Sequence, residues 1–328
     1  MTEASEYRST RRAEEADTAN RSDGPAEHKL TRRDALKWAG AAAGALAVPG
    51  LWSSSAATAR SPVVPAQTTP PWNHNPASPI GPSHWGAIGY PTCGSGTRQS
   101  PVNIDTRSVT RLNGPPLLVK YGPSELAIEN TGHVVEVPIP AGVTDTLRIG
   151  DDSYQLTQYH FHAPSEHAIN GRLADVEAHF VHQNSQGDIA VVGVFFRIGP
   201  DPNPLLTKIL FSAPVTANHE VTIGEASPAE LFPRVDNGSH RNLKVASFYT
   251  YSGSLTTPDC SQDVRWSVLA DGGHVAPAAV ERFHFVISQF PHYGGYPNNN
   301  RPAQPLNGRV IRFRAREHAP RGIPIPGH

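Results

Sequence analysis

Short runs in which apolar and polar residues alternate recur along this chain, and turn-forming residues separate them. Alternation with a period of two is typical of strands that bury one face, and this spacing predicts an antiparallel β-sheet. The predicted strands lie at residues 117–121, 125–129, 134–138, 146–149, 154–162, 175–183, 189–198, 248–251, 264–269 and 310–313. Two other runs, 205–212 and 277–289, have proline near their first turn and predict short helices. We see no internal repeat, so we expect one folded domain that is mostly β.

The first 59 residues follow a different pattern. A polar stretch is followed by Arg32-Arg33, then by a weakly apolar run over residues 38–52, and then by small residues up to Ala59. This order is typical of a twin-arginine export signal that is cleaved after Ala59. A short buried helix is the alternative interpretation. A membrane anchor is disfavoured, because the run is short and Pro49 interrupts it.

We therefore expect four segments. They are an export signal with a polar N-terminal extension (1–59), a flexible linker rich in Pro, Ser and Thr (60–82), the folded domain (83–316) and a C-terminal tail (317–328). The precursor would bind the twin-arginine export machinery, and the mature protein would reach the periplasm, the cell wall or the medium without a stable membrane anchor. The sequence leaves the oligomeric state open, a homo-oligomer included.

Composition narrows the class of protein further. The net charge is −1, so the chain has no overall basic excess of the kind that binds nucleic acid, and we expect no nucleic-acid partner. The 32 prolines and 28 glycines favour a turn-rich β protein over a helical bundle.

The chain has two cysteines, Cys93 and Cys260. Two cysteines in an exported protein usually form a disulfide, and we expect one here. A bridge that closes so long a loop would contribute about 5 kcal/mol as an upper figure. Two free, buried thiols are the alternative.

Three histidines carry the clearest chemical signal. His160 and His162 are two residues apart on a predicted strand, so both side chains lie on one face, about 7 Å apart along it. His179 lies in a second predicted strand, and antiparallel pairing would place it opposite the first two. Three neutral imidazoles with one open position are the ligand set of a catalytic zinc ion.

Other polar residues near this motif fall into two groups. Gln158 and Glu177 each precede a histidine by two residues on the same face, where an acceptor can fix the orientation of a ligand imidazole. His182 has the opposite parity to His179, and His167 lies in a turn after a proline. We assign structural or surface roles to these last two histidines, and we do not count them as ligands.

A tight loop of small residues, Ser252 to Pro258, is the next candidate element. Its hydroxyl side chains could orient a solvent molecule, because a hydroxyl both donates and accepts hydrogen bonds. The hydroxyl that accepts from solvent must donate its own proton elsewhere, and Glu166 is the candidate acceptor.

Taken in order, these motifs resemble those of an α-class carbonic anhydrase of the bacterial, exported kind. The resemblance covers nearly all of residues 84–313. The matching segments are His84-Trp85-Gly86, Arg98 to Ile104, Asn130 to His133, Gln158 to His167, Glu177 to His179, Ser254 to Pro258 and Arg301 to Leu306.

The resemblance implies a fold, a cofactor and a reaction. The fold would be a large, twisted, mainly antiparallel sheet of about ten strands with short peripheral helices. The reaction would be the zinc-dependent, reversible hydration of carbon dioxide to bicarbonate and a proton. A disulfide between Cys93 and Cys260 also fits exported bacterial members of the family.

The resemblance also implies individual roles. Zn²⁺ would be bound by His160, His162 and His179, Thr256 would orient the attacking hydroxide with Glu166 behind it, and His133 would be the proton shuttle. Gln158 and Glu177 would orient two ligands, and the backbone carbonyl of Asn299 a third. The substrate pocket would be lined by Val181, Val191, Leu255, Thr257 and Trp266.

His133 follows Gly132 in a turn-like setting, so we expect it to be exposed and mobile. Two other functions stay open: a zinc esterase, and a non-catalytic carbonic-anhydrase-like binding module on the cell surface. The presence of all three histidines counts against the second.

Overall fold

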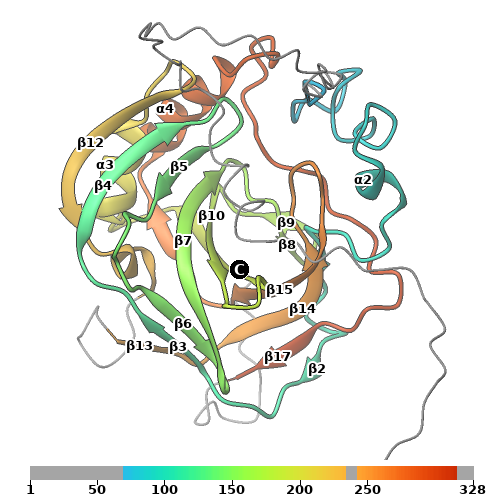
Figure 1. Cartoon of the computed structure of the whole chain (residues 1–328), viewed down its shortest axis with the longest axis vertical. Coiled ribbons are helices and arrows are strands. Elements are labelled where there is room, and N and C mark those ends of the chain that lie inside the picture. Colours follow the sequence, from blue (N-terminus) through green and yellow to red (C-terminus); the bar gives the residue numbers. More distant parts are fainter. Residues whose placement is uncertain (1–68, 234–241, 316–328) are drawn as a thin grey trace, which may run out of the picture. The chain divides into compact units, whose positions relative to one another are not determined.

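The structure is a computed structural model that describes residues 69–233 and 242–315. Its main element is a 14-stranded sheet (Figure 1). The strands of this sheet are β2 (Thr110–Arg111), β3 (Leu117–Lys120), β4 (Ser124–Asn130), β5 (Val135–Pro138), β6 (Thr146–Ile149), β7 (Asp152–His162), β10 (Val176–Gln183), β11 (Ile189–Ile198), β12 (His219–Ala226), β13 (Leu243–Val245), β14 (Phe248–Ser254), β15 (Gln262–Leu269), β16 (Gly273–Val275) and β17 (Arg312–Arg314). The export signal and the C-terminal tail lie outside the described residues.

A second, three-stranded sheet is formed by β1 (Asn103–Ile104), β8 (Ala168–Ile169) and β9 (Arg172–Leu173). The main path of the large sheet runs β12-β4-β5-β7-β10-β11-β15-β14-β17-β2. Most neighbours pair antiparallel, but β11 pairs parallel with β15 and β16, and β17 pairs parallel with β2. The predicted mainly antiparallel sheet is therefore confirmed, with more strands than the ten expected.

All ten predicted strands are present, each within a few residues of its expected bounds. The longest unpredicted strand in the described part of the chain is β12, which is mostly exposed. It lies at the edge of the sheet, so it buries no regular apolar face from which alternation could be recognised. Other unpredicted strands have two or three residues, too few to show a period.

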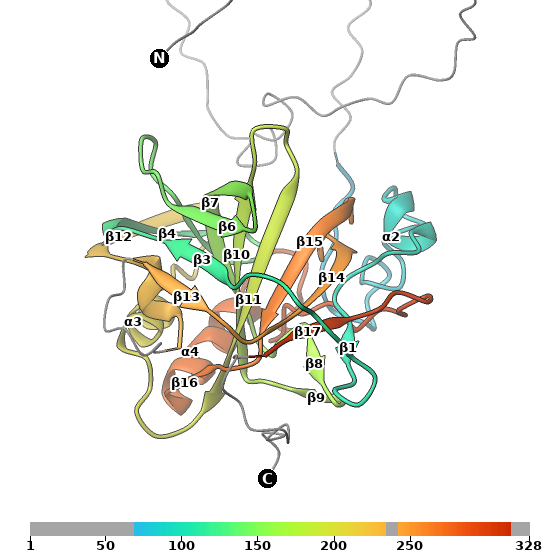
Figure 2. The same cartoon turned by 90° about the horizontal axis from the view of Figure 1, so that it is seen from below.

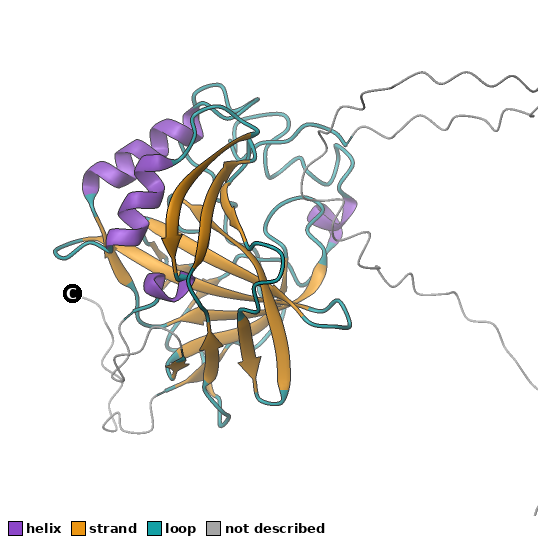
Figure 3. Ribbon diagram, turned by 60° about the vertical axis from the view of Figure 1, so that its left-hand side comes forward, coloured by secondary structure: helices purple, strands orange, loops and turns teal. Residues whose placement is uncertain are grey.

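Both predicted helices are present and pack against each other beside the sheet (Figure 3). They are α3 (Pro204–Ser212) and α4 (Pro277–Ser288), and each begins with proline at its first position, where no backbone N–H is needed. The Asn203 side chain accepts a hydrogen bond from Leu206 N and so caps α3. Shorter helical turns are α2 (Pro91–Ser95) and the 3₁₀ helix η2 (Pro228–Leu231).

The two faces of the central strands serve different purposes. On one face of β7 and β10, Tyr159, Phe161 and Phe180 join the main apolar core with residues of α3 and α4. On the other face, alternate positions of the same strands carry the histidines. Figure 2 shows β10 and β11 at the centre, with α3 and α4 on one side and α2 on the other.

The predicted disulfide is confirmed: Cys93 in α2 is bonded to Cys260. The bridge packs with Trp85 and Tyr90 in a small apolar cluster of its own. It joins the N-terminal part of the domain to the loop that follows β14. None of the helices within residues 69–233 and 242–315 is long and apolar enough to cross a membrane.

The expected flexible linker over residues 60–82 does not hold for its described part, 69–82. Asn73 and His74 are buried, and the Asn73 side chain donates hydrogen bonds to Ser78 Oγ and to the carbonyl of His292. Trp85 Nε1 donates to the carbonyl of Asn73. Polar composition alone therefore did not reveal that this segment packs onto the domain.

Replacing both cysteines (Cys93→Ser with Cys260→Ser) is expected to lower the free energy of unfolding by about 2–5 kcal/mol, because the unfolded chain regains the freedom of a 167-residue loop. Urea denaturation of the oxidised wild type and of the double variant measures the difference. An unchanged midpoint and slope would show that the bridge contributes nothing to stability.

Candidate metal centre

The pairing of β7 with β10 brings the three predicted ligands together. His179 lies directly opposite His160, and Glu177 lies opposite His162. One nitrogen from each of the three histidines lies within 4.8 Å of the others, close enough to surround one metal ion. His162 and His179 are buried, whereas His160 is half-buried and lies toward solvent.

The other ring nitrogen of each histidine lies within 3.0 Å of an acceptor oxygen. His160 Nδ1 lies 2.8 Å from Gln158 Oε1, His162 Nδ1 lies 2.8 Å from the carbonyl of Asn299, and His179 Nε2 lies 3.0 Å from Glu177 Oε1. These contacts place the proton of each ring on its outer nitrogen. They leave Nε2 of His160, Nε2 of His162 and Nδ1 of His179 free to bind a metal. Both acceptors predicted from the sequence, and the carbonyl of Asn299, take these positions.

The donor set fits Zn²⁺. Burial lowers the pKa of His160 well below 6.5 and lowers that of His162, so these rings stay neutral, as metal ligands must. Burial acts the same way on His179, but Glu177 outweighs it and the pKa is raised. His162 Nε2 is buried and has no hydrogen-bond partner among the described residues, which a bound metal would explain.

Glu177 is fully buried and is held by more groups than the sequence indicated. Its Oε2 accepts from the backbone N–H groups of Glu166 and His167, both at 2.9 Å, and its Oε1 lies 2.8 Å from His167 Nδ1. Burial alone would raise the pKa of Glu177, but His167 and His179 outweigh it and hold the pKa well below 4.5. A Cβ on Gly193 would lie 2.8 Å from Glu177 Oε1, so only glycine leaves room there.

His167 is buried and has a structural role. Its Nδ1 contacts Glu177, and its Nε2 lies 2.7 Å from the Tyr251 hydroxyl, which lies 2.8 Å from Ser100 Oγ. Both ring nitrogens are thus engaged, and His167 is not free to bind a metal with Glu177 and His179, although the three cluster closely. Sequence reasoning missed the contribution of His167, Tyr251 and Ser100, because they come from three distant segments.

His182 points to the other side of β10, as its parity predicts. The pairing of β10 with β7 shifts register between Val181 and His182, yet the ring still lies in the main core beside Tyr121 and the carbonyl of Ala190. Burial lowers the pKa of His182 to about 3.

Glu166 lies behind the ligand set. Its Oε1 accepts from the backbone N–H of Arg301 at 2.7 Å. Its Oε2 lies 3.6 Å from His162 Nε2 and 3.8 Å from His179 Nδ1, and has no hydrogen-bond partner among the described residues. Arg301 is itself fixed, since its guanidinium donates to Gln99 Oε1 and to the carbonyls of Ser100 and Cys93.

Thr256 is buried in the loop after β14. The start of this loop is anchored by Ser254, which exchanges hydrogen bonds with Ser100, and by Trp266 Nε1, which donates to the carbonyl of Ser254. Further along, the backbone N–H of Leu255 donates to the carbonyl of Ser261. The pairing of Thr256 with Glu166 stays a prediction.

The residues of the predicted apolar wall lie side by side. Val181, Val191 and Trp266 are register partners on the adjacent strands β10, β11 and β15. Leu255 packs against the same cluster, and the ring centroids of His179 and Trp266 are 4.8 Å apart. Thr257, in the same loop, is half-buried. An apolar surface therefore adjoins the ligand set.

The expectation that His133 is exposed is wrong. Its ring stacks on Trp72 with centroids 3.8 Å apart and planes at 8°. Burial, together with the nearby His292, lowers its pKa to about 4. The physical reason is that Trp72, from a segment distant in the chain, packs over the turn that carries His133.

Residues 72–74 also bring a histidine into the centre of the domain. His74 is fully buried, its Nδ1 lies 2.5 Å from the Tyr293 hydroxyl, and its ring centroid lies 6.4 Å from that of His162. Burial lowers the pKa of His74 well below 6.5, and His162, His133 and Arg301 lower it further. The aromatic residue Trp72 within a Pro-rich stretch was the signal that could have revealed this segment.

A carboxylate also lies beside the ligand set. Glu136 on β5 is the register partner of His160 on β7 and of Glu129 on β4. Burial and the charge of Glu129 raise the pKa of Glu136 to about 7.

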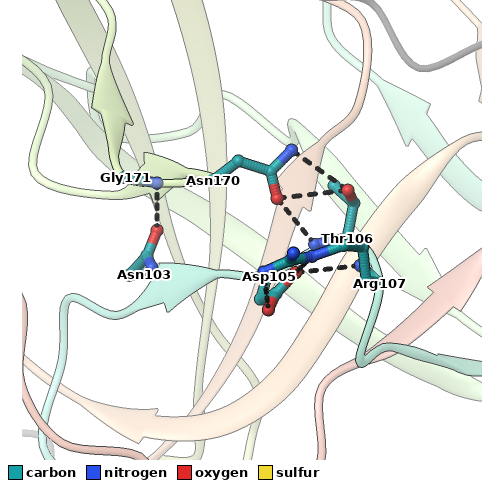
Figure 4. Close-up of a pocket in the computed structure, with 6 residues that line it drawn as sticks. All are labelled: Asn103, Asp105, Thr106, Arg107, Asn170 and Gly171. Atoms are coloured by element: carbon teal, nitrogen blue, oxygen red, sulfur yellow. Dashed lines mark hydrogen bonds and ion pairs between the residues drawn. The ribbon is translucent and has the colours of Figure 1, made fainter.

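A separate hollow lies beside the three-stranded sheet (Figure 4). Its polar groups bond to one another: Asn170 to Thr106, Gly171 N to Asn103, and Arg107 to Asp105. None of its lining residues belongs to the histidine site.

Known proteins share both the sequence and the fold. The model of the family described as eukaryotic-type carbonic anhydrase matches residues 80–315. The carbonic anhydrase of Klebsiella pneumoniae is 35% identical over 232 residues, which are 70% of this chain and 86% of that protein. The chain therefore belongs to the carbonic anhydrase family, as an enzyme of that family.

Solved structures agree with this assignment. The α-carbonic anhydrase of Thermovibrio ammonificans, in complex with the inhibitor sulfanilamide, has a TM-score of 0.64 and 34% identity, and the match covers 74% of this chain and 99% of that one. A structure of dioscorin complexed with ascorbate has a TM-score of 0.65 and 29% identity, covering 76% and 100% of the two chains.

Acid is expected to destabilise the protein in part through His182. The pKa of His182 is about 3 in the folded protein and about 6.5 in the unfolded chain. Between these two pH values the unfolded state therefore binds more protons. Stability is therefore lost as the pH falls from 6.5 toward 3. In His182→Gln, the free energy of unfolding that is lost between pH 6.5 and pH 5 should be smaller than in the wild type by roughly 2 kcal/mol.

Urea denaturation at the two pH values measures this difference, with the exposed His219→Gln as the matched control. If the wild type and His182→Gln lose the same free energy of unfolding between the two pH values, the lowered pKa of His182 is contradicted.

Proposed function

We propose that this protein catalyses the zinc-dependent, reversible hydration of carbon dioxide to bicarbonate and a proton. The supporting observation is the ligand set itself: three imidazoles converge, and each outer nitrogen lies within 3.0 Å of its own acceptor. A zinc ion bound there supplies a hydroxide nucleophile near neutral pH, the chemistry for which carbonic anhydrases are the standard example.

His160, His162 and His179 would hold the ion, and Gln158, Glu177 and the Asn299 carbonyl would fix the three rings. Oriented, neutral ligands need little reorganisation when the metal binds, which raises affinity. The buried charge of Glu177 beside His179 also strengthens that ligand as a donor.

Glu166 and Thr256 would aim the attacking oxygen. Glu166 Oε2 is buried and has no partner among the described residues, so it can accept the proton of a hydroxyl that faces the site. Thr256, in the adjoining buried loop, is that hydroxyl in this proposal. Its own oxygen then accepts from solvent and fixes the direction of attack.

Carbon dioxide is apolar and has no group that needs a strong hydrogen bond. The surface formed by Val181, Val191, Leu255 and Trp266 suits such a substrate, and Thr257 lies at its rim. The proton must leave for bulk solvent, and His133 is the proposed carrier. Burial lowers its pKa to about 4 while its ring stacks on Trp72, so an efficient carrier must leave that buried position to accept a proton near neutral pH.

We also propose that the protein is exported to the periplasm, cell wall or medium after recognition of its twin-arginine signal. The disulfide between Cys93 and Cys260 supports this location, since such bonds persist in oxidising compartments. A zinc esterase would use the same nucleophile, and a binding module would need no metal. Carbon dioxide hydration by zinc-loaded protein separates the anhydrase from both alternatives, and the zinc content of the purified protein separates the esterase from the binding module.

His160→Ala is expected to lower the zinc content of purified protein at least about tenfold, because one of three protein ligands is lost. Atomic absorption measures zinc per chain, and stopped-flow carbon dioxide hydration measures the activity. His219→Ala, an exposed histidine, is the control and should keep stoichiometric zinc. Near-stoichiometric zinc in His160→Ala would defeat the ligand assignment.

His133→Ala is expected to slow turnover in weak buffer by about tenfold or more, because the proposed proton carrier is removed. Added imidazole should restore part of the rate. Stopped-flow measurements across buffer concentrations test this, and an unchanged rate in weak buffer would remove His133 from the proton path.

A further inference from the structure

Several buried polar side-chain atoms have no hydrogen-bond partner within the described residues, and His74 Nε2 is one that the proposed zinc site does not explain. His74 Nε2 is buried and makes no hydrogen bond within the described residues, while Nδ1 of the same ring bonds to Tyr293. Leaving a buried donor or acceptor unpaired is costly, so such an atom calls for a ligand or a held solvent molecule.

The bond to Tyr293 decides which kind of partner is missing. Burial raises the pKa of Tyr293 well above 10, so its hydroxyl keeps its proton. If that O–H donates to His74 Nδ1, the neutral ring carries its proton on Nε2 and one donor is left over. If Nδ1–H donates instead, both Nε2 and the Tyr293 proton lack a partner. The first arrangement leaves fewer groups unpaired.

The surroundings of the ring place this donor next to the proposed site. The His74 ring lies edge-on to the ligand His162 and to Trp85, at centroid distances of 6.4 and 5.6 Å. It also packs edge-on against Trp72, at 5.2 Å, and Trp72 covers His133. One short segment, residues 72–74, therefore contacts both a zinc ligand and the proposed proton carrier.

We propose that His74 is a positioning residue of this site, and that its Nε2–H holds a buried solvent molecule beside the ligand set. The inference rests on the proposed carbonic anhydrase activity. The held solvent would be a fixed link in the path by which protons reach His133, so its loss should affect proton transfer more than the reaction with carbon dioxide.

Two variants separate this role from simple packing. The amide of His74→Gln can place a donor near the position of Nε2, whereas the shorter His74→Asn reaches only the position of Nδ1. In zinc-loaded protein and weak buffer, His74→Asn should lower kcat about two- to tenfold, the effect of one hydrogen bond, with kcat/KM and zinc content within about twofold. His74→Gln should recover most of kcat. His84→Asn, at an exposed histidine in the same part of the chain, is the matched control.

A crystal structure supplies a readout that does not depend on activity. An ordered water within about 3.2 Å of His74 Nε2, lost in His74→Asn, is expected. The proposal is overturned if no water lies there, or if His74→Asn and wild type have equal kcat in weak buffer, or if His74→Asn and His74→Gln are equally impaired. Failure of the proposed function is a different result: zinc-loaded wild type that does not hydrate carbon dioxide, whether or not the water is present.

Discussion

The antiparallel pairing of β7 with β10 is the constraint on which the site depends. Because side chains alternate along a strand, this register places His160 and His179 opposite each other on one face, and Tyr159 and Phe180 together in the core on the other. A slip by one residue would exchange the two faces, exposing aromatic rings and burying imidazoles among apolar side chains. The energy of the apolar core therefore also fixes the geometry of the ligands.

A buried carboxylate extends this arrangement beyond the two strands. Glu177 is fully buried, and an isolated charge there would be very unfavourable. It is stabilised by two backbone N–H groups and by His167, which in turn bonds to Tyr251, and the absence of a side chain at Gly193 leaves room for it. Such a network is stable only when every member is present, so it makes the position of His179 depend on residues far away in the chain.

Much of the fold and the ligand set could be predicted, because period-two patterns and His-x-His spacing are local. The strand β12 was missed because an edge strand buries no regular face. His167 was correctly denied a ligand role, but its bonds to Glu177 and Tyr251 join segments that no local pattern connects. The segment from Trp72 to His74 resembled a linker in composition, yet Trp72 stacks on His133 and the His74 ring lies edge-on to His162.

The sequence by itself determined which residues can bind a metal, on which face of their strands they lie and which neighbours can orient them. Strand periodicity and donor chemistry are properties of neighbouring residues, so they need no knowledge of the whole fold. Only the tertiary structure decided that Asn299 holds His162, that Arg301 holds Glu166, and that Trp72 covers His133. Those contacts join residues between 61 and 137 positions apart, and their formation depends on packing of the entire sheet.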